Sequence, residues 1–437
     1  MLKIDTTTET IESKGGLILA GKIALKAGIG KIKSAFVKQA ASIIICLYGI
    51  MIEGKHDYES IGEKRGNVFF QEALGLPHVY SKDTVRLYIE DMACNADEVI
   101  GQLRESAARI ICQAPLHGLW IGGNHYLPVD IDTAAMDNSK TKKEGVSRTY
   151  QGYDGYHPIL AYVGKEGYIL DCELRPGSQH CQKGTVEFIE GVMEQLKGGI
   201  QAKGRILFRL DSGNDSFDTL KAVTTSGKSQ YCIIKRNRRR ENDEVWLKRA
   251  KRYGKRVKSR KGKKVWIGTI DIHPKRKEER LEEVRMVFEV IERKKDAAGN
   301  RLLFPEITVN SWWTNLSCSA EKVIELYHAH ATSEQFHSEL KHDLDIERLP
   351  SGKMEVNRIV LAVAMNAYNA LKLLGQKSIE KENKKYTKRK RVRTVIRELI
   401  CVAGKLVSHG RELIFKINEK DPIRPIFMRL NAILDCT

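Results

Sequence analysis

Residues 327–341 read YHAHATSEQFHSELK, and this stretch decides the predicted fold. Its side chains at i, i+3, i+7 and i+14 fall on one stripe of a predicted helix. They are Tyr327, His330, Glu334 and Lys341. Taken alone, such a stripe is an ordinary polar helix face, so its meaning depends on acidic residues elsewhere in the chain.

Two aspartates far upstream each close an apolar run that predicts a β-strand. The segment 126–132 alternates in polarity, which puts Asp130 and Asp132 on one face of its strand. The segment 204–211 is a second strand and ends at Asp211. A carboxylate at a strand end leaves the core while its backbone stays rigid. We therefore expect Asp132, Asp211 and Glu334 to converge on Mg²⁺, with Asp130 as the alternative to Asp132.

Composition predicts a globular protein with a polyanionic partner. The 437 residues are 42% hydrophobic and 30% charged, and the formal net charge is +19. This length favours two or three domains, and the charge favours nucleic acid or an anionic membrane surface. The apolar run 40–52 is shorter than the roughly 18 residues needed to span a bilayer, so it predicts a buried helix. The polar start of the chain predicts a cytoplasmic protein.

Positive charge is concentrated between residues 235 and 264, where sixteen Lys or Arg accompany three acids. Such a cluster repels itself unless a polyanion is bound, although a solvated run of charges is the alternative. Strand-like runs follow at 265–272 and 284–291. We interpret the region as a β-rich insertion whose basic strand or loop faces DNA, with Arg238, Arg239 and Arg240 as candidate contacts.

The remaining patterns predict an α/β protein with a mixed sheet flanked by helices. Residues 1–120 are mainly helical, with Ser81 as an N-cap. The turn around Gly75 and Pro77 suits a DNA-reading helix-turn-helix or an ordinary helical bundle, and both stay open. A hairpin is predicted across 157–174, helices at 185–196, 320–344 and 357–374, and a strand at 230–235. A polar linker, 376–388, precedes a basic helical region at 389–415. His328 and His330 point to different sides of their helix, which argues against zinc.

The ordered motifs resemble those of bacterial insertion-sequence transposases with a DDE, RNase H-like core, whose signature is Y-x2-R-x3-E-x6-K. Tyr327, Glu334 and Lys341 match, whereas His330 replaces the family's Arg, which weakens a phosphate contact at that position. Segments similar to other family motifs are 130–132, 211–213, 313–316, 349–351, Asn357 and 367–369. The 123-position gap from Asp211 to Glu334 is similar to that of members with a β-strand insertion.

The resemblance implies that Asp132, Asp211 and Glu334 hold Mg²⁺, or Mn²⁺ as a substitute, and that Tyr327 and Lys341 contact DNA near the element end. It predicts a helical DNA-binding region at 1–120 and an RNase H-like core at 121–236, interrupted by a basic insertion at 237–316. The core resumes at 317–375 with the Glu334 helices, and a basic helical region occupies 376–437.

The predicted activity is cleavage and joining of double-stranded DNA at element ends and target. The predicted assembly is a homodimer on DNA, associated with the bacterial nucleoid and with no membrane partner. Two alternatives stay open. One is an RNase H-like DNA nuclease that cuts without joining, and the other is a catalytically silent DNA-binding regulator derived from a transposase.

Overall fold

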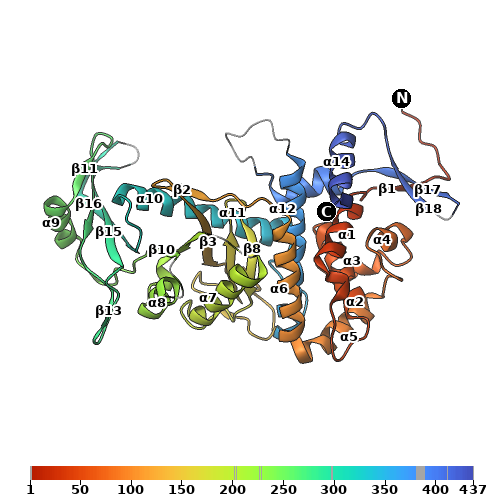
Figure 1. The fold of residues 1–437 in the computed structure, drawn as a ribbon, viewed down its shortest axis with the longest axis horizontal. Coiled ribbons are helices and arrows are strands. Elements are labelled where there is room, and N and C mark those ends of the chain that lie inside the picture. The colour runs from red at the N-terminus through yellow and green to blue at the C-terminus, as the bar shows by residue number, and fades with distance from the viewer. Residues whose placement is uncertain are drawn as a thin grey trace.

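The computed structural model describes residues 2–200, 202, 204–225, 227, 229–296, 299–379, 389–410 and 412–436. The molecule is elongated, with a central sheet between a β-rich end and a helical end (Figure 1). Among the described residues, no helix combines the length and apolar character needed to cross a membrane. The apolar run 40–52 instead forms α2, which is buried in the helical end.

The central sheet has the strand order β8-β7-β3-β9-β10. Strands β3, β9 and β10 run parallel, and β7 is antiparallel to both of its neighbours. Helix α8 connects the parallel strands β9 and β10. This arrangement confirms the predicted mixed sheet flanked by helices. The bounds are β3 Asn124–Thr133, β7 Ile159–Val163, β8 Tyr168–Glu173, α7 Thr185–Glu194, β9 Arg205–Leu210, α8 Phe217–Thr225 and β10 Gln230–Lys235.

The insertion extends this same sheet. Strand β16 pairs antiparallel with β10, and β15, β12 and β11 follow outward. The basic run also contains a helix, α9, where a strand or loop was expected. Asn242 caps α9 by accepting backbone N–H groups, and Trp246 and Ala250 bury one of its faces. The bounds are α9 Asp243–Tyr253, β11 Lys255–Val257, β12 Lys263–Ile270, β13 Lys275–Arg276, β14 Glu279–Arg280, β15 Arg285–Lys295 and β16 Arg301–Thr314.

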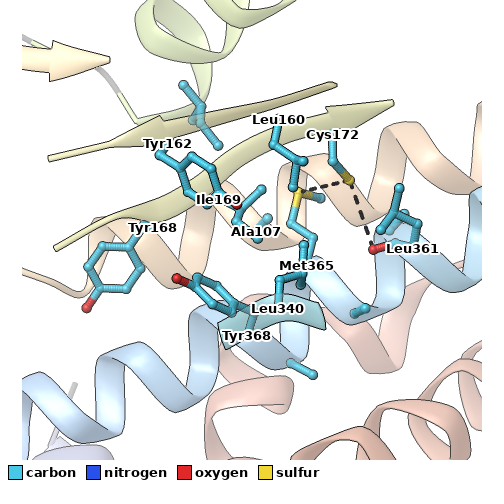
Figure 2. Packing of buried hydrophobic residues seen from close by; sticks show 14 of the residues in the cluster. Ala107, Leu160, Tyr162, Tyr168, Ile169, Cys172, Leu340, Leu361, Met365 and Tyr368 are labelled. Atoms are coloured by element: carbon cyan, nitrogen blue, oxygen red, sulfur yellow. Dashed lines mark hydrogen bonds between the residues drawn. The ribbon is translucent and has the colours of Figure 1, made fainter. Parts of the chain in front are cut away.

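The helical end is built from the first part of the chain and from α12. Ser81 caps α5 as predicted, because its Oγ accepts the Thr84 N–H at 3.1 Å. Helix α12 packs against α6, α2 and β8. Figure 2 shows Met365 and Tyr368 of α12 packed close to Tyr162 and Ile169 of the sheet. The bounds are α1 Leu17–Ala27, α2 Ala40–Ile52, α3 Tyr58–Gly62, α4 Val68–Ala73, α5 Lys82–Met92, α6 Ala96–Cys112 and α12 Met354–Ser378.

The predicted helix 320–344 is divided into shorter pieces. Helix α10 (Ala320–His328) leads through a 3₁₀ turn, Ala329–Thr332, into α11 (Ser333–Ser338), and a π-helical turn, Glu339–Asp343, follows. The changes of pitch occur where this segment makes polar contacts with β3, and such irregular turns are frequent at functional sites. An uninterrupted helix was therefore a wrong prediction.

The C-terminal region is only partly helical, which corrects the prediction for 389–415. After α13 (Val392–Val395), strands β17 (Gly404–His409) and β18 (Glu412–Ile417) form a hairpin, and α14 (Arg424–Cys436) follows. Strand β17 also pairs with β1 (Thr10–Glu12) from the opposite end of the chain. Residues 380–388 of the predicted linker lie outside the described part. The short strands near the site are β2 Leu119–Ile121, β4 Met136–Asp137, β5 Ser147–Arg148 and β6 Asp154–Tyr156.

Candidate active site

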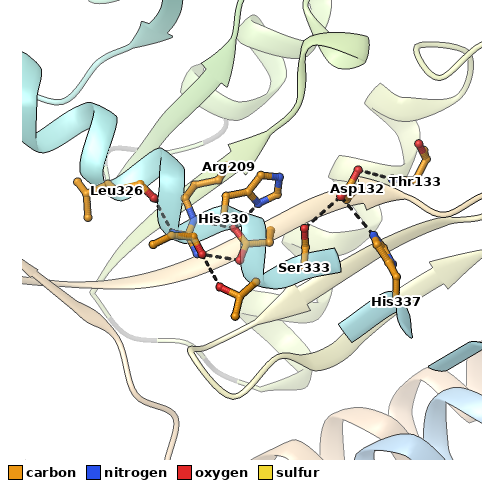
Figure 3. Close-up of polar contacts among 10 residues, drawn as sticks. Asp132, Thr133, Arg209, Leu326, His330, Ser333 and His337 are labelled. Carbon is orange, nitrogen blue, oxygen red and sulfur yellow. Dashed lines mark hydrogen bonds and ion pairs between the residues drawn. The ribbon is translucent and has the colours of Figure 1, made fainter. Parts of the chain in front are cut away.

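Asp132 lies near the end of β3 with its carboxylate facing α11 (Figure 3). Its Oδ1 accepts the backbone N–H of Thr133 at 2.8 Å. Its Oδ2 contacts Ser333 Oγ at 3.1 Å and His337 Nε2 at 3.2 Å. Burial opposes ionisation of Asp132, but the hydrogen bond from His337 and the other contacts of the carboxylate outweigh it, so the pKa of Asp132 is lowered. The carboxylate is therefore an anion at neutral pH, held by three neighbours.

Asp211 follows β9, the parallel neighbour of β3. Its Oδ1 accepts the Gly213 N–H at 3.2 Å and the Asn214 amide at 2.7 Å, which shapes the turn after the strand. Burial and then the negative charge of Asp132 raise the pKa of Asp211. The two carboxylates thus repel one another, and a bound cation would reverse that repulsion.

Glu334 projects from α11 and is exposed. Within the described part of the chain it forms no hydrogen bond or ion pair. It lines the same open cleft as Asp132 and Asp211, with a volume of about 560 Å³. The predicted three carboxylates, distant in sequence, therefore border one solvent-accessible space.

The donor set of this cleft fits a hard divalent cation. All three candidate ligands offer carboxylate oxygens, which Mg²⁺ prefers. Asp211 Oδ2 and the Glu334 carboxylate accept no hydrogen bond from any described residue, so both stay available. The described residues nevertheless contain no ready-made group of three or more acidic, His or Cys side chains around a metal position. Gathering the three carboxylates on a cation therefore requires side-chain movement, for which exposed Glu334 has room.

The carboxylate of Asp130, the alternative to Asp132, is already bound by neighbouring side chains. Its carboxylate forms a two-bonded ion pair with Arg209, at 2.6 and 2.7 Å, and contacts His330 Nδ1 at 3.0 Å. All three side chains are buried. Arg209 also donates to the Leu326 carbonyl at 2.8 Å, which ties β9 to α10. This geometry favours Asp132 over Asp130 as a ligand facing the cleft.

The three signature residues besides Glu334 occupy different settings. Tyr327 lines the cleft, half-buried, and packs against Trp312. Lys341 lines it too, but its ammonium contacts the Ala135 carbonyl and Glu347, each at 2.8 Å. His330 is buried, so its ring faces Asp130 rather than the solvent that a DNA phosphate would occupy. Burial lowers the pKa of His330, but the charge and hydrogen bond of Asp130 more than compensate, so the pKa is raised.

The basic insertion contains both paired and unpaired cations. Arg238 forms an ion pair with Asp243, whereas Arg239 and Arg240 are exposed. A denser cluster surrounds the turn between β11 and β12, where seven cations line one pocket. Only Lys264 has a carboxylate partner there, Glu292 at 3.9 Å, among the described residues. The seven cations, hereafter the basic turn, are Arg256, Lys258, Arg260, Lys261, Lys263, Lys264 and Lys294.

Asparagines of the family-like motifs are structural. Asn315 bonds the backbone of β10 at Cys232 N–H and Gln230 O, 2.8 and 2.9 Å away. Asn369 of α12 bonds both backbone groups of Ile169 at 2.8 Å. Asn357 bonds the backbone of Ser351 in the same way.

Three further acidic residues of the core are engaged in other contacts. Asp137 accepts the Ser139 N–H, and Asp215 accepts the Trp313 indole N–H. Glu339 is buried and paired with Lys372 and Arg389.

Comparison with known proteins identifies the family. A family model described as "Transposase DDE domain group 1" matches residues 1–436. The chain belongs to this transposase family. DDE transposases act on DNA and generally use divalent metal ions. The carboxylate oxygens that border the cleft are suitable ligands for such ions. No curated protein matches the transposase sequence. Among solved structures, a cryo-EM structure of the piggyBac transposase synaptic complex with hairpin DNA is similar, with a TM-score of 0.43 and 10% identity over 88% of this chain and 76% of that chain.

Sequence reasoning missed the residues that hold Asp132. Ser333 and His337 flank Glu334, one and three positions away, and both reach the same oxygen of Asp132. His337 in turn contacts the buried Tyr162 hydroxyl at 2.9 Å. The one available signal was the spacing of Ser333 and His337, which puts both on the helix face adjacent to that of Glu334.

Proposed function

We propose that this chain is a Mg²⁺-dependent transposase that cleaves and joins DNA strands at the ends of an insertion sequence, with Mn²⁺ as a substitute ion. One observation carries the proposal: Asp132, Asp211 and Glu334 border a single open cleft in a chain of net charge +19. These three residues would hold the metal ions. When bound, such ions supply a strong nucleophile at neutral pH and neutralise charge on the attacking and leaving oxygens.

Two in-line substitutions at phosphorus account for the activity. Water attacks the phosphodiester at the element end, which breaks a P–O bond and frees a 3′-hydroxyl. That hydroxyl then attacks target DNA, forming a new P–O bond while the displaced strand end leaves with a proton. Both steps have the same geometry, so a single set of carboxylates serves both, and no covalent protein–DNA intermediate is needed.

DNA contacts in this proposal come from several parts of the chain. Tyr327 and Lys341 border the cleft and would lie close to the reacting strand. Exposed Arg239 and Arg240, with the basic turn, would contact phosphates along the flanking duplex. The N-terminal helices would contribute recognition of the element end. Bringing two ends together favours a homodimer on DNA, in the bacterial cytoplasm at the nucleoid.

Cleavage of the DNA that flanks its own gene tests the proposal. With Mg²⁺, the parent chain should cut at the element end, and pre-cut ends should join to a plasmid target. Glu334→Gln removes a charged ligand, so cleavage should fall at least about 100-fold, a loss of several kcal/mol of transition-state stabilisation. Glu325→Gln is the matched control, because Glu325 is an exposed α10 carboxylate paired with Lys322 outside the cleft.

Each rival activity has its own outcome. Cleavage without joined products would identify a nuclease. DNA binding without cleavage by the parent chain would identify a silent regulator. Full activity in Glu334→Gln would contradict the assignment of the site.

A further inference from the structure

The His337 ring lies between a buried phenol and the Asp132 carboxylate. Its Nδ1 is 2.9 Å from Tyr162 Oη, and its Nε2 is 3.2 Å from Asp132 Oδ2. Tyr162 belongs to β7, is fully buried, and its hydroxyl has no other hydrogen-bond partner among the described residues. Figure 3 shows Ser333 and His337 side by side, each reaching the Asp132 carboxylate from below.

The chemistry of these groups determines the direction of both bonds. An ionised carboxylate only accepts hydrogen bonds, so Nε2 must carry a hydrogen toward Asp132. In a neutral ring Nδ1 then accepts, and the Tyr162 hydroxyl is the donor beside it. The phenol therefore selects the imidazole tautomer that can hold Asp132.

The same turn of helix presents Glu334 to the cleft. Ser333 and His337 are four positions apart, so they lie on one face of α11, and both contact Oδ2 of Asp132. Glu334 directly follows Ser333 and is exposed on the adjacent face. A displacement of α11 relative to β3 that altered the separation of Asp132 and Glu334 would therefore also disturb both contacts.

We propose that His337, held by Tyr162, is a positioning residue that fixes the orientation of Asp132 and the spacing between Asp132 and Glu334. This inference rests on the proposed function, because it treats both carboxylates as metal ligands. Hydrogen-bonding partners behind metal ligands commonly change metal affinity 10–100-fold when they are removed. His337 is expected to act on metal binding, not on DNA binding.

Mn²⁺ binding to the full chain, followed by EPR of the free ion, tests the role of His337 without requiring turnover. His337→Leu removes the donor and should weaken Mn²⁺ binding about 10–100-fold. His337→Gln keeps an N–H group near the Nε2 position and should bind Mn²⁺ close to the parent value. Tyr162→Phe deletes one hydroxyl and should weaken binding in the same direction but less. Affinity for end DNA in metal-free buffer should be the same in all variants.

His117→Gln is the matched control, because His117 also contacts a carboxylate, Glu166, outside the cleft. Unchanged Mn²⁺ affinity in folded His337→Leu would overturn the inference. If that variant does not fold, Tyr162→Phe decides, and parent-like binding in it would overturn the inference. If the parent chain binds no Mn²⁺ and cleaves no end DNA, the proposed function itself is overturned. If the parent does both and the His337 variants match it, only the positioning role is overturned.

Discussion

Buried carboxylates join separate parts of this transposase through ion pairs. Asp130 on β3 is paired with Arg209 on β9, and Asp171 on β8 is paired with Arg104 on α6 at 2.6 Å. Removing a carboxylate from water is costly, and the partner's charge offsets that cost only in part. Burial accordingly raises the pKa of Asp171 to about 6, although Arg104 pulls it downward. The ion pair of Asp171 therefore joins the sheet to α6, and the free-energy cost of burying its carboxylate depends on pH.

Asp171→Asn should stabilise the protein at neutral pH. The pKa of Asp171 is higher in the folded state than in the unfolded state, so the folded state binds a proton more tightly. The contribution of Asp171 to the free energy of unfolding therefore falls as the pH rises from about 4 to 6. A rise from 3.8 to about 6 corresponds to about 3 kcal/mol. Asparagine keeps the Oδ1 acceptor for Cys172 N–H and Arg104. Urea unfolding of parent and variant at pH 4 and pH 7.5 measures the difference.

The gain should be small at the lower pH and approach its full size at the higher one, because the pKa of about 6 already includes the attraction of Asp171 to Arg104. If Asp171→Asn gains no stability over the parent between pH 4 and pH 7.5, the Asp171 charge is not opposed by burial.

At the scale of elements, α12 connects the central sheet to the helical end. Asn369 lies fully buried in α12, and its amide pairs with both the N–H and the C=O of Ile169 on β8. The side chain thus occupies the position that another strand would take at this edge. Asn366, one turn earlier, donates to carbonyls of Leu103 and Ala362, while its own oxygen is buried and has no hydrogen-bond partner among the described residues.

Asn369→Ala should destabilise the protein by about 2–5 kcal/mol, because two buried backbone groups lose their partners at about 1–3 kcal/mol each. Asn366→Ala is the matched control on the same helix. It removes an unsatisfied oxygen along with its donor, so its loss should be clearly smaller. Urea midpoints with unchanged m-values measure both effects. Equal losses in the two variants would contradict the strand-like role of Asn369.

At the scale of the whole molecule, positive charge is distributed unevenly. The insertion and the helical region lie at opposite ends, with the cleft-bearing core between them (Figure 1). In the first part of the basic run, Arg236 and Arg238 are neutralised by Glu241 and Asp243. Six of the seven cations of the basic turn have no carboxylate within ion-pair distance in the described part of the chain. The basic turn is therefore a dense group of uncompensated charges within the insertion.

Removal of three cations from the basic turn should reduce the salt dependence of DNA binding. Each phosphate contact contributes a slope of about −0.9 to log K against log salt, so K258Q/R260Q/K261Q should flatten the slope by about 2.7. K3Q/K416Q/K420Q removes three exposed cations at the opposite end and should leave the slope unchanged. Fluorescence anisotropy of duplex DNA across a salt series measures both. Parallel slopes for the parent and the basic-turn variant would exclude the turn from the DNA contact.

The sequence by itself determined the elements whose signals are local. The apolar runs ending at 132 and 211 predicted β3 and β9. The hairpin predicted across 157–174 contains β7 and β8, and the strand predicted at 230–235 coincides with β10. The period of side chains along a strand or helix is a property of the backbone alone, so it can be read without knowing the fold. The ordered acidic motifs likewise sufficed for the family, which the match over residues 1–436 confirms.

Only the tertiary structure decided what each polar side chain contacts. Asp130 and Asp132 share a face of β3, yet Arg209 and His330 bury the first while the second borders the cleft. The pairing of β17 with β1 joins residues almost 400 positions apart, and no local pattern carries that information. Burial and charge compensation arise between segments that meet only in the folded chain. Periodicity therefore located the carboxylates in the sequence, but not the contacts of His337 and Tyr162 that support Asp132.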